Sequence, residues 1–210
     1  MPSNKNFKRR VRGRMAVTGE RYTKAREQIR ATGGGNPHRV PGWHLAGSRP
    51  AEYEIGLETD LTYRSRRVAY LKSIVDRSAG FGTIMQTISS ENYQDRRVML
   101  SAWIQGDELD GWAGLWMRVD GPNSNVPLAF DNMQRRALRG TFGWQKAQVV
   151  LDVAAEAVDI AFGVLLEGGG TVRMADFRLE IVDASVPVTN TASIHREPRN
   201  LDFSLDRELD

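Results

Sequence analysis

Tryptophans and hydrogen-bonding side chains gather on two predicted strands of this 210-residue chain. Over residues 112–120, Trp116 and Arg118 alternate with apolar residues, and over residues 98–105 Trp103 is out of phase with the apolar set. Because successive side chains of a strand point to opposite faces, these residues should lie on the face turned away from the core. A sugar site needs that mixture, an indole plate for the pyranose ring and polar groups for its hydroxyls.

If these strands are neighbours, one sheet face carries a ligand site, with a glutamine from residues 82–89 and the pair Asp131-Asn132 near its rim. The candidate ligand-binding residues are Gln86, Trp103, Trp116, Arg118, Asp131 and Asn132. Two structural alternatives stay open. The tryptophans, which bury a large area, could fill a second core layer with Arg118 paired to an aspartate. Asp131 and Asn132 could form Asx turns at a strand end.

Signatures of catalysis are weak. The three histidines, His38, His44 and His195, lie at no metal-ligand spacing, and the chain has no cysteine. No nucleophile elbow, phosphate-binding loop or dinucleotide-binding glycine pattern occurs in the sequence. We therefore expect no catalytic residues, no metal and no cofactor, and a binding protein is favoured over an enzyme.

The elements that position these residues are short strands. From Trp43 onward the apolar residues recur with period 2, and glycine, proline and asparagine turns separate the segments. This spacing, without a convincing long helix, predicts an all-β antiparallel sandwich. Further predicted strands cover 67–73, 82–89, 126–131, 145–153, 159–167 and 171–182. The residues expected inside are Leu100, Ala102, Leu115, Met117, Val149, Leu151 and Phe177.

The charge of the chain is unevenly distributed. Residues 1–30 carry a net charge of +8, so the other 180 residues carry −5 of the overall +3. Such an asymmetry is typical of an arm that meets a polyanion. The arm could equally pack on the acidic body of its own or a neighbouring chain, because a charge run reports electrostatics without specificity. The candidate nucleic-acid-binding residues are Lys8, Arg9, Arg10, Arg12 and Arg14.

The sequence predicts three regions. Residues 1–35 form a short basic helical arm, because apolar residues recur there at helical spacing before Gly33-Gly34-Gly35. Residues 36–186 form the sandwich, and residues 187–210 form an extended tail. No apolar run approaches the ~18 residues of a membrane helix, and the start lacks a signal sequence, so we expect a cytoplasmic protein without a membrane partner.

A series of motifs in fixed order carries a resemblance to a known family. The motifs are GWHLAGSRPAEYEIGLE (42–58), AYLKS (69–73), GFGTIMQ (80–86), WAGLWMRVDG (112–121), AFDNMQ (129–134), WQKAQVVLDV (144–153) and IAFGVLLEGGG (160–170). Together they resemble a bacterial jelly-roll domain of the galactose-binding-like, carbohydrate-binding-module type. That domain occurs alone and attached to AraC-type transcriptional regulators. The chain departs from the family pattern over residues 171–178, where a tryptophan near Arg173 is missing.

Two functions from different classes follow. The first is a non-enzymatic binding module whose jelly-roll face holds a small, sugar-like ligand while the basic arm docks to an anionic partner. The second is a nucleic-acid-, transcription- or ribosome-associated factor that acts through the arm, with the sandwich as a rigid body that could dimerise. Deleting residues 1–35 separates them, because the deletion leaves ligand binding intact under the first and abolishes activity under the second.

Overall fold

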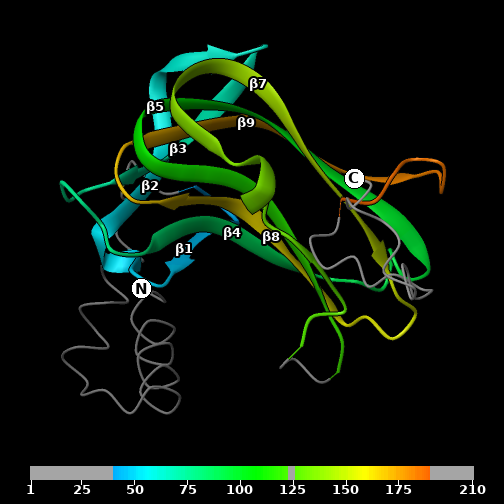
Figure 1. Cartoon of the computed structure of the whole chain (residues 1–210). Coiled ribbons are helices and arrows are strands. Elements are labelled where there is room, and N and C mark those ends of the chain that lie inside the picture. Colours follow the sequence, from blue (N-terminus) through cyan, green and yellow to red (C-terminus); the bar gives the residue numbers. More distant parts are fainter. Residues whose placement is uncertain (1–39, 123–125, 190–210) are drawn as a thin grey trace, which may run out of the picture. The chain divides into compact units, whose positions relative to one another are not determined.

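A computed structural model describes residues 40–122 and 126–189 of the chain (Figure 1). The chain divides at residues 41 and 42 into two units, and the architecture that follows is that of the described part of the second unit. Its described strands are β1 (His44–Gly47), β2 (Tyr53–Tyr63), β3 (Arg66–Ser73), β4 (Phe81–Ser89), β5 (Arg96–Asp120), β6 (Ala129–Asp131), β7 (Leu138–Val153), β8 (Asp159–Glu167) and β9 (Thr171–Val182). Two short 3₁₀ helices are η1 (Pro50–Glu52) and η2 (Gln134–Arg136).

The 25-residue strand β5 connects two halves of one curled antiparallel sheet (Figure 1). Its first part, residues 96–107, lies between β9 and β7, and β3 and β2 follow beyond β9. Its last part, residues 112–120, lies between β8 and β6, and β4 and β1 follow beyond β8. We call the half that contains β2, β3, β9 and β7 the first sheet, and the half that contains β1, β4, β8 and β6 the second sheet.

The sheet bends between these halves. The pairing of β5 with β7 shifts register at Gly106 and Leu109, and Glu108 has a left-handed backbone with φ of 53°. Opposite this point, the turn between β8 and β9 contains Gly170, which has φ of 100°. A Cβ at Gly170 would lie 2.5 Å from the carbonyl oxygen of Glu108, so only glycine fits there. Bulges and a glycine turn therefore bend the sheet at one line, as bulges commonly do.

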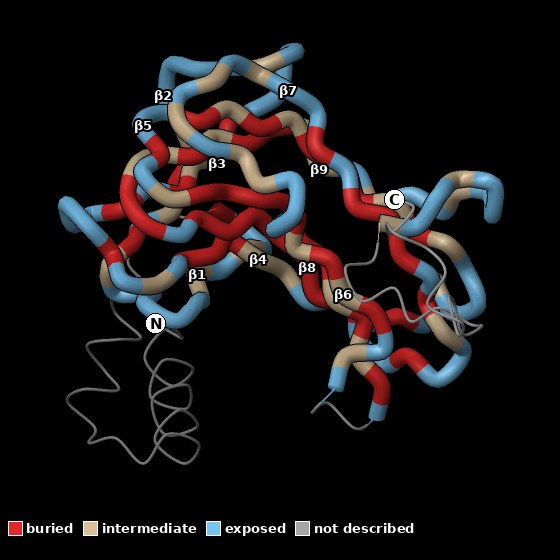
Figure 2. The backbone as a smooth tube through the Cα atoms, viewed as in Figure 1, coloured by how far each residue is buried: buried red, intermediate tan, exposed pale blue. Residues whose placement is uncertain are grey.

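The core lies between the two sheets and is filled by every second residue of the strands (Figure 2). On β5, Leu100 and Leu115 are both completely buried, one from each sheet. Phe177 is only half-buried and packs beside Trp43, with ring centroids 4.7 Å apart. The predicted interior residues that are buried are Leu100, Ala102, Leu115, Met117, Val149 and Leu151.

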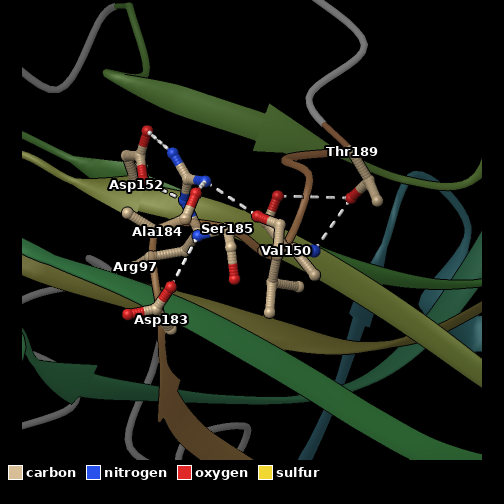
Figure 3. Close-up of polar contacts among 8 residues, drawn as sticks. Arg97, Val150, Asp152, Asp183, Ala184, Ser185 and Thr189 are labelled. Carbon is tan, nitrogen blue, oxygen red and sulfur yellow. Dashed lines mark hydrogen bonds and ion pairs between the residues drawn. The ribbon is translucent and has the colours of Figure 1, made fainter.

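The described chain ends in a segment, residues 183–189, that reaches the free edge of β7 (Figure 3). Arg97 donates to the carbonyl oxygens of Ala184 and Val186, and its Nε lies 2.7 Å from Oδ1 of Asp152. The hydrogen bond to Asp152 raises the pKa of the Arg97 guanidinium. Thr189 pairs with Val150, because its N–H donates to the Val150 carbonyl at 2.8 Å and its hydroxyl oxygen accepts from the Val150 N–H.

The predicted all-β antiparallel class is confirmed, with two differences in detail. The segments 98–105 and 112–120, expected as separate strands, are parts of the single strand β5. The strands β2 and β7 also extend further than the alternation over residues 52–58 and 145–153 suggested. The predicted arm, residues 1–35, and the tail beyond Thr189 lie outside the described residues, so the predicted region boundaries stay predictions. Among the described residues, no helix is both long and apolar enough to cross a membrane.

Candidate functional site

The outward face of the first sheet carries a row of aromatic and polar residues from four strands. Cross-strand partners Gly56, Tyr70, Arg173 and Gln105 follow one another across β2, β3, β9 and β5. Trp103 lies on the same face of β5, two residues before Gln105, because side chains alternate along a strand. Ile104, between Trp103 and Gln105 on β5, points into the core and is completely buried. Trp103 and Gln105 therefore lie on the face of the sheet that is turned away from the core, toward solvent.

An aromatic cluster stands at the end of this row. Tyr63, the last residue of β2, stacks on Trp144 of β7 with centroids 4.4 Å apart and an interplanar angle of 22°. The Tyr63 ring also lies 5.4 Å from the Trp103 ring. We call Tyr63, Trp103 and Trp144 the aromatic cluster. All three side chains are half-buried, so part of each remains open to a ligand.

The turn between β2 and β3 adds a cation to the aromatic cluster. Arg64 and Ser65 have φ of 51° and 60°, and the flanking residues Tyr63 and Arg66 are paired. Two consecutive left-handed residues are the signature of a type I′ hairpin turn, and Arg and Ser adopt this conformation less readily than Asn-Gly. This turn directs the guanidinium of Arg64 over the Trp103 ring, with Cζ 4.2 Å from the centroid.

A pocket of about 360 Å³ opens beside the cluster, with Trp144 as its aromatic wall. Its other lining residues are mainly polar and come from the end of β2 and from β5 and β9: Glu58, Thr59, Asp60, Leu61, Gln105 and Arg173. Arg173 is held in place, because its Nε lies 2.7 Å from Oε1 of Glu58 and its Nη1 lies 3.7 Å from Oδ2 of Asp107. The pocket thus combines an indole wall with fixed donors and acceptors, the composition of a site for a small polar ligand.

Tyr70 of β3 belongs to the row of residues on this outward face. Its ring lies against Gly56, where a Cβ would come within 2.6 Å of the phenol oxygen. Partial burial, and then the negative charges of Glu54 and Glu58, raise the pKa of the Tyr70 phenol. Gly56 is the residue that leaves room for this ring on the sheet.

The structure places Trp116 away from Trp103. Because β5 passes from one sheet to the other, Trp103 lies on the outward face of the first sheet and Trp116 on that of the second. The expectation that they share one face is wrong, since it treated two parts of one bent strand as neighbouring strands. Trp116 is 9% exposed, lies opposite Gly163, and donates from Nε1 to Oγ1 of Thr83 at 2.8 Å. Trp112, Ala161 and Leu165 complete a buried apolar cluster around it.

Most other predicted ligand residues make local contacts. Asp131 is completely buried, and its carboxylate accepts from the Met133 N–H at 2.8 Å and from Nη2 of Arg136 at 2.6 Å. Asn132 forms an Asx turn, because its Oδ1 accepts from the Gln134 N–H at 3.1 Å. These contacts match the local-structure alternative for both residues.

The remaining two predicted residues also lie apart from Trp103. Nε of Arg118 is 2.8 Å from Oδ1 of Asp120, on the outward face of the second sheet. Gln86 is the cross-strand partner of Phe162, a core residue, so it points to the inner side of β4. Of the six predicted residues, only Trp103 belongs to the aromatic cluster.

The sequence reasoning missed Tyr63, Arg64, Trp144 and Arg173. Tyr63 and Trp144 lie in the parts of β2 and β7 that extend beyond the predicted strands. Trp144 has the parity of the outward residues of β7, so a longer strand would have placed it on this face. On the predicted strand 171–182, Arg173 alternates with the buried residues Val172 and Met174. This alternation could have placed Arg173 on the outward face.

Metal ligands are not clustered in the described part of the chain, where no three histidine or acidic side chains are placed to hold an ion. The lining carboxylate of Glu58 is instead occupied by Arg173. Arg173 is paired in turn with Glu58 and lies near Asp107, so these charged groups act on one another.

The chain is similar in sequence to a bacterial regulator and in fold to solved structures. No protein-family model matches the chain. The uncharacterized HTH-type transcriptional regulator YbfP of Bacillus subtilis (strain 168) is 38% identical over 169 residues, which cover 79% of this chain and 57% of that protein. The chain thus spans a little over half the length of this relative. The match agrees with the pairing of such domains with regulators that the sequence motifs implied.

Two solved structures show the architecture. The CBM22-1–CBM22-2 tandem domain from Paenibacillus barcinonensis Xyn10C superposes with a TM-score of 0.50 and 11% identity, covering 70% of this chain and 42% of that one. The enzymatically active domain of bacteriophage CBA120 tailspike protein 4 gives a TM-score of 0.52 and 13% identity, over 72% and 21% of the two chains. At such identities the likeness concerns the fold. The body of this chain is a jelly-roll domain with the fold of carbohydrate-binding modules.

Proposed function

We propose that this protein is a non-enzymatic binding module that holds a saccharide in the pocket beside the aromatic cluster. The observation that carries the proposal is the pocket of about 360 Å³ with Trp144 on one side and polar side chains on the other. A pyranose has an apolar face and a rim of hydroxyls, so it matches both walls at once. The jelly-roll fold shared with carbohydrate-binding modules supports the same ligand class.

Each part of the site has a role in this proposal. The Trp144 ring is braced by Tyr63, and Tyr63 by Trp103, so the plate keeps its orientation without a ligand. Gln105 offers a donor and an acceptor, and the Glu58–Arg173 pair offers charged partners for sugar hydroxyls. Such preorganisation reduces the entropy lost on binding.

The test is isothermal titration calorimetry of the full chain with neutral oligosaccharides, xylo- and galacto-oligomers first. Trp144→Ala removes the plate and should abolish binding, because stacked aromatic area contributes a few kcal/mol, most of a weak affinity. Gln105→Ala should weaken binding about tenfold through lost hydrogen bonds.

Phe81→Ala is the matched control. Phe81 is an aromatic residue, 36% exposed, on the outward face of the second sheet. It should leave the affinity unchanged. If no saccharide binds, or if Trp144→Ala binds as well as the wild type, the proposal fails.

A second proposal concerns the basic arm and rests on the identity to an HTH-type transcriptional regulator. We infer that the module serves in transcription, with its arm contacting nucleic acid; a role of this kind belongs in the cytoplasm. Reversing the arm charges at Lys8, Arg9, Arg10, Arg12 and Arg14 to glutamate should remove binding to duplex DNA. The logarithm of the affinity should fall against the logarithm of salt with a slope near −0.9 per phosphate contacted. Salt-independent binding, or binding retained by a chain that starts at residue 36, contradicts this proposal.

A further inference from the structure

We propose that the saccharide bound by this site is acidic, and that its carboxylate lies between the Arg64 guanidinium and the Lys146 ammonium. This inference rests on the proposed function and names the ligand class for the same site. It follows from the positions of the cations around the aromatic cluster and from their different partners.

Arg64 presents its hydrogen-bond donors to the site. Its guanidinium lies over the Trp103 ring at 4.2 Å and 5.7 Å from the Tyr63 ring, so the aromatic faces hold the flat side of the group. Stacking leaves the in-plane N–H donors available, and these match a carboxylate in a bidentate arrangement. Within the described residues, Arg64 forms no ion pair with an aspartate or glutamate.

Lys146 lies beside the same indole. It is the direct cross-strand partner of Trp103, so both side chains stand on the outward face of the first sheet. It follows Trp144 by two residues, which places the two Cα atoms about 7 Å apart, within the span of a disaccharide. Lys146 is exposed and, over residues 40–122 and 126–189, makes no ion pair with a carboxylate.

The third cation of the site differs from these two. Arg173 is already paired with Glu58 and lies near Asp107, so its charge is balanced within the pocket. Asp60 adds another negative group to the same wall. A carboxylate would be repelled on this side and attracted on the side of Arg64 and Lys146. The charges thus orient an acidic sugar, with its hydroxyls toward the pocket and its carboxylate toward the two cations.

The experiment compares full-chain affinities for three probes: an oligogalacturonate, the neutral galactose oligomer of equal length, and a single-stranded oligonucleotide. The oligogalacturonate should bind about tenfold or more tightly than the neutral oligomer, as one charge-assisted contact allows. That preference should shrink as salt is raised. Lys146→Gln should reduce the preference several-fold while leaving the neutral affinity in place, and Arg64→Gln should also reduce the preference several-fold.

Lys72→Gln is the matched control, because Lys72 is an exposed lysine on the same outward face, next to Thr171 and Glu54 rather than Trp103. It should leave the preference unchanged. Equal affinity for both oligomers overturns the acidic-ligand inference and leaves the saccharide proposal standing. Binding of neither oligomer overturns both. Tighter binding of the oligonucleotide, lost in Lys146→Gln, assigns the cations to phosphate and also overturns the inference.

Discussion

Trp103 and Trp116, two of the three tryptophans of β5, should respond differently to truncation. Trp116 is 9% exposed, within the cluster formed with Trp112, Ala161 and Leu165. A buried indole covers roughly 150–250 Å² of apolar surface. At about 25 cal/mol per Å² this area is worth about 4–6 kcal/mol, an upper bound because the unfolded chain is itself partly compact. We therefore expect Trp116→Ala to lower the free energy of unfolding by about 3–5 kcal/mol.

Trp103→Ala should cost much less stability, because its side chain is half-buried and faces solvent. A loss of about 1–2 kcal/mol is expected from the smaller buried area. Trp116→Phe separates the contribution of buried apolar area from that of the hydrogen bond, because it removes the hydrogen bond to Thr83 and keeps most of the ring. It should cost about 1–2 kcal/mol.

Urea denaturation of the full-length variants measures these differences through the midpoint and the slope. The expected order of stability loss is Trp116→Ala, then Trp116→Phe and Trp103→Ala at similar values. If Trp116→Ala costs under about 1 kcal/mol, or Trp103→Ala costs as much as Trp116→Ala, the assignment of one tryptophan to packing and the other to the site is refuted.

Three further predictions concern the fold. Leu115→Ala should lower the free energy of unfolding by about 2–5 kcal/mol, because Leu115 is completely buried, and a loss under about 1 kcal/mol contradicts the core assignment. Gly163→Ala should destabilise by about 1–3 kcal/mol, since its Cβ would lie 2.1 Å from the Ile84 carbonyl oxygen; Gly143→Ala, with nothing within 4 Å, is the control and should change little. The hydrogen bond from the Ser185 N–H lowers the pKa of Asp183 in the folded protein. The turn at residues 183–185 should therefore be intact above pH 3.8, the ordinary pKa of an aspartate, and should open as the pH falls through the lower pKa that Asp183 has in the folded protein. Amide exchange at Ser185 checks this, and opening already at pH 6 contradicts it.

The fold was predictable because its signals are local. Alternation identified the buried side of β5 at Leu100 and Leu115 independently of how the strands pair. The same alternation could not show that residues 98–105 and 112–120 belong to one bent strand. The bend depends on the register shifts at Gly106 and Leu109 and on the close approach of Gly170, which are tertiary features.

The site was less predictable for the same reason. Trp103 was correctly assigned to an outward face, but its partners Tyr63 and Arg64 come from the hairpin between β2 and β3, and Trp144 of β7 joins the cluster by stacking on Tyr63. Those contacts join residues about 40 to 80 positions apart, and no spacing in the sequence encodes them. Trp116 has the same outward parity yet is buried, because Trp112, Ala161 and Leu165 pack around its ring and its Nε1 donates to Thr83.

The central claim is that saccharide binds at the aromatic cluster on the outward face of the first sheet. The indole N–H signals of the five tryptophans, followed by two-dimensional NMR during titration with an oligosaccharide, test it directly. The signals of Trp103 and Trp144 should shift with a common binding curve, while those of Trp112 and Trp116 stay in place. Shifts at Trp112 and Trp116 with Trp103 and Trp144 unchanged, or no shift at any indole, would contradict the claim.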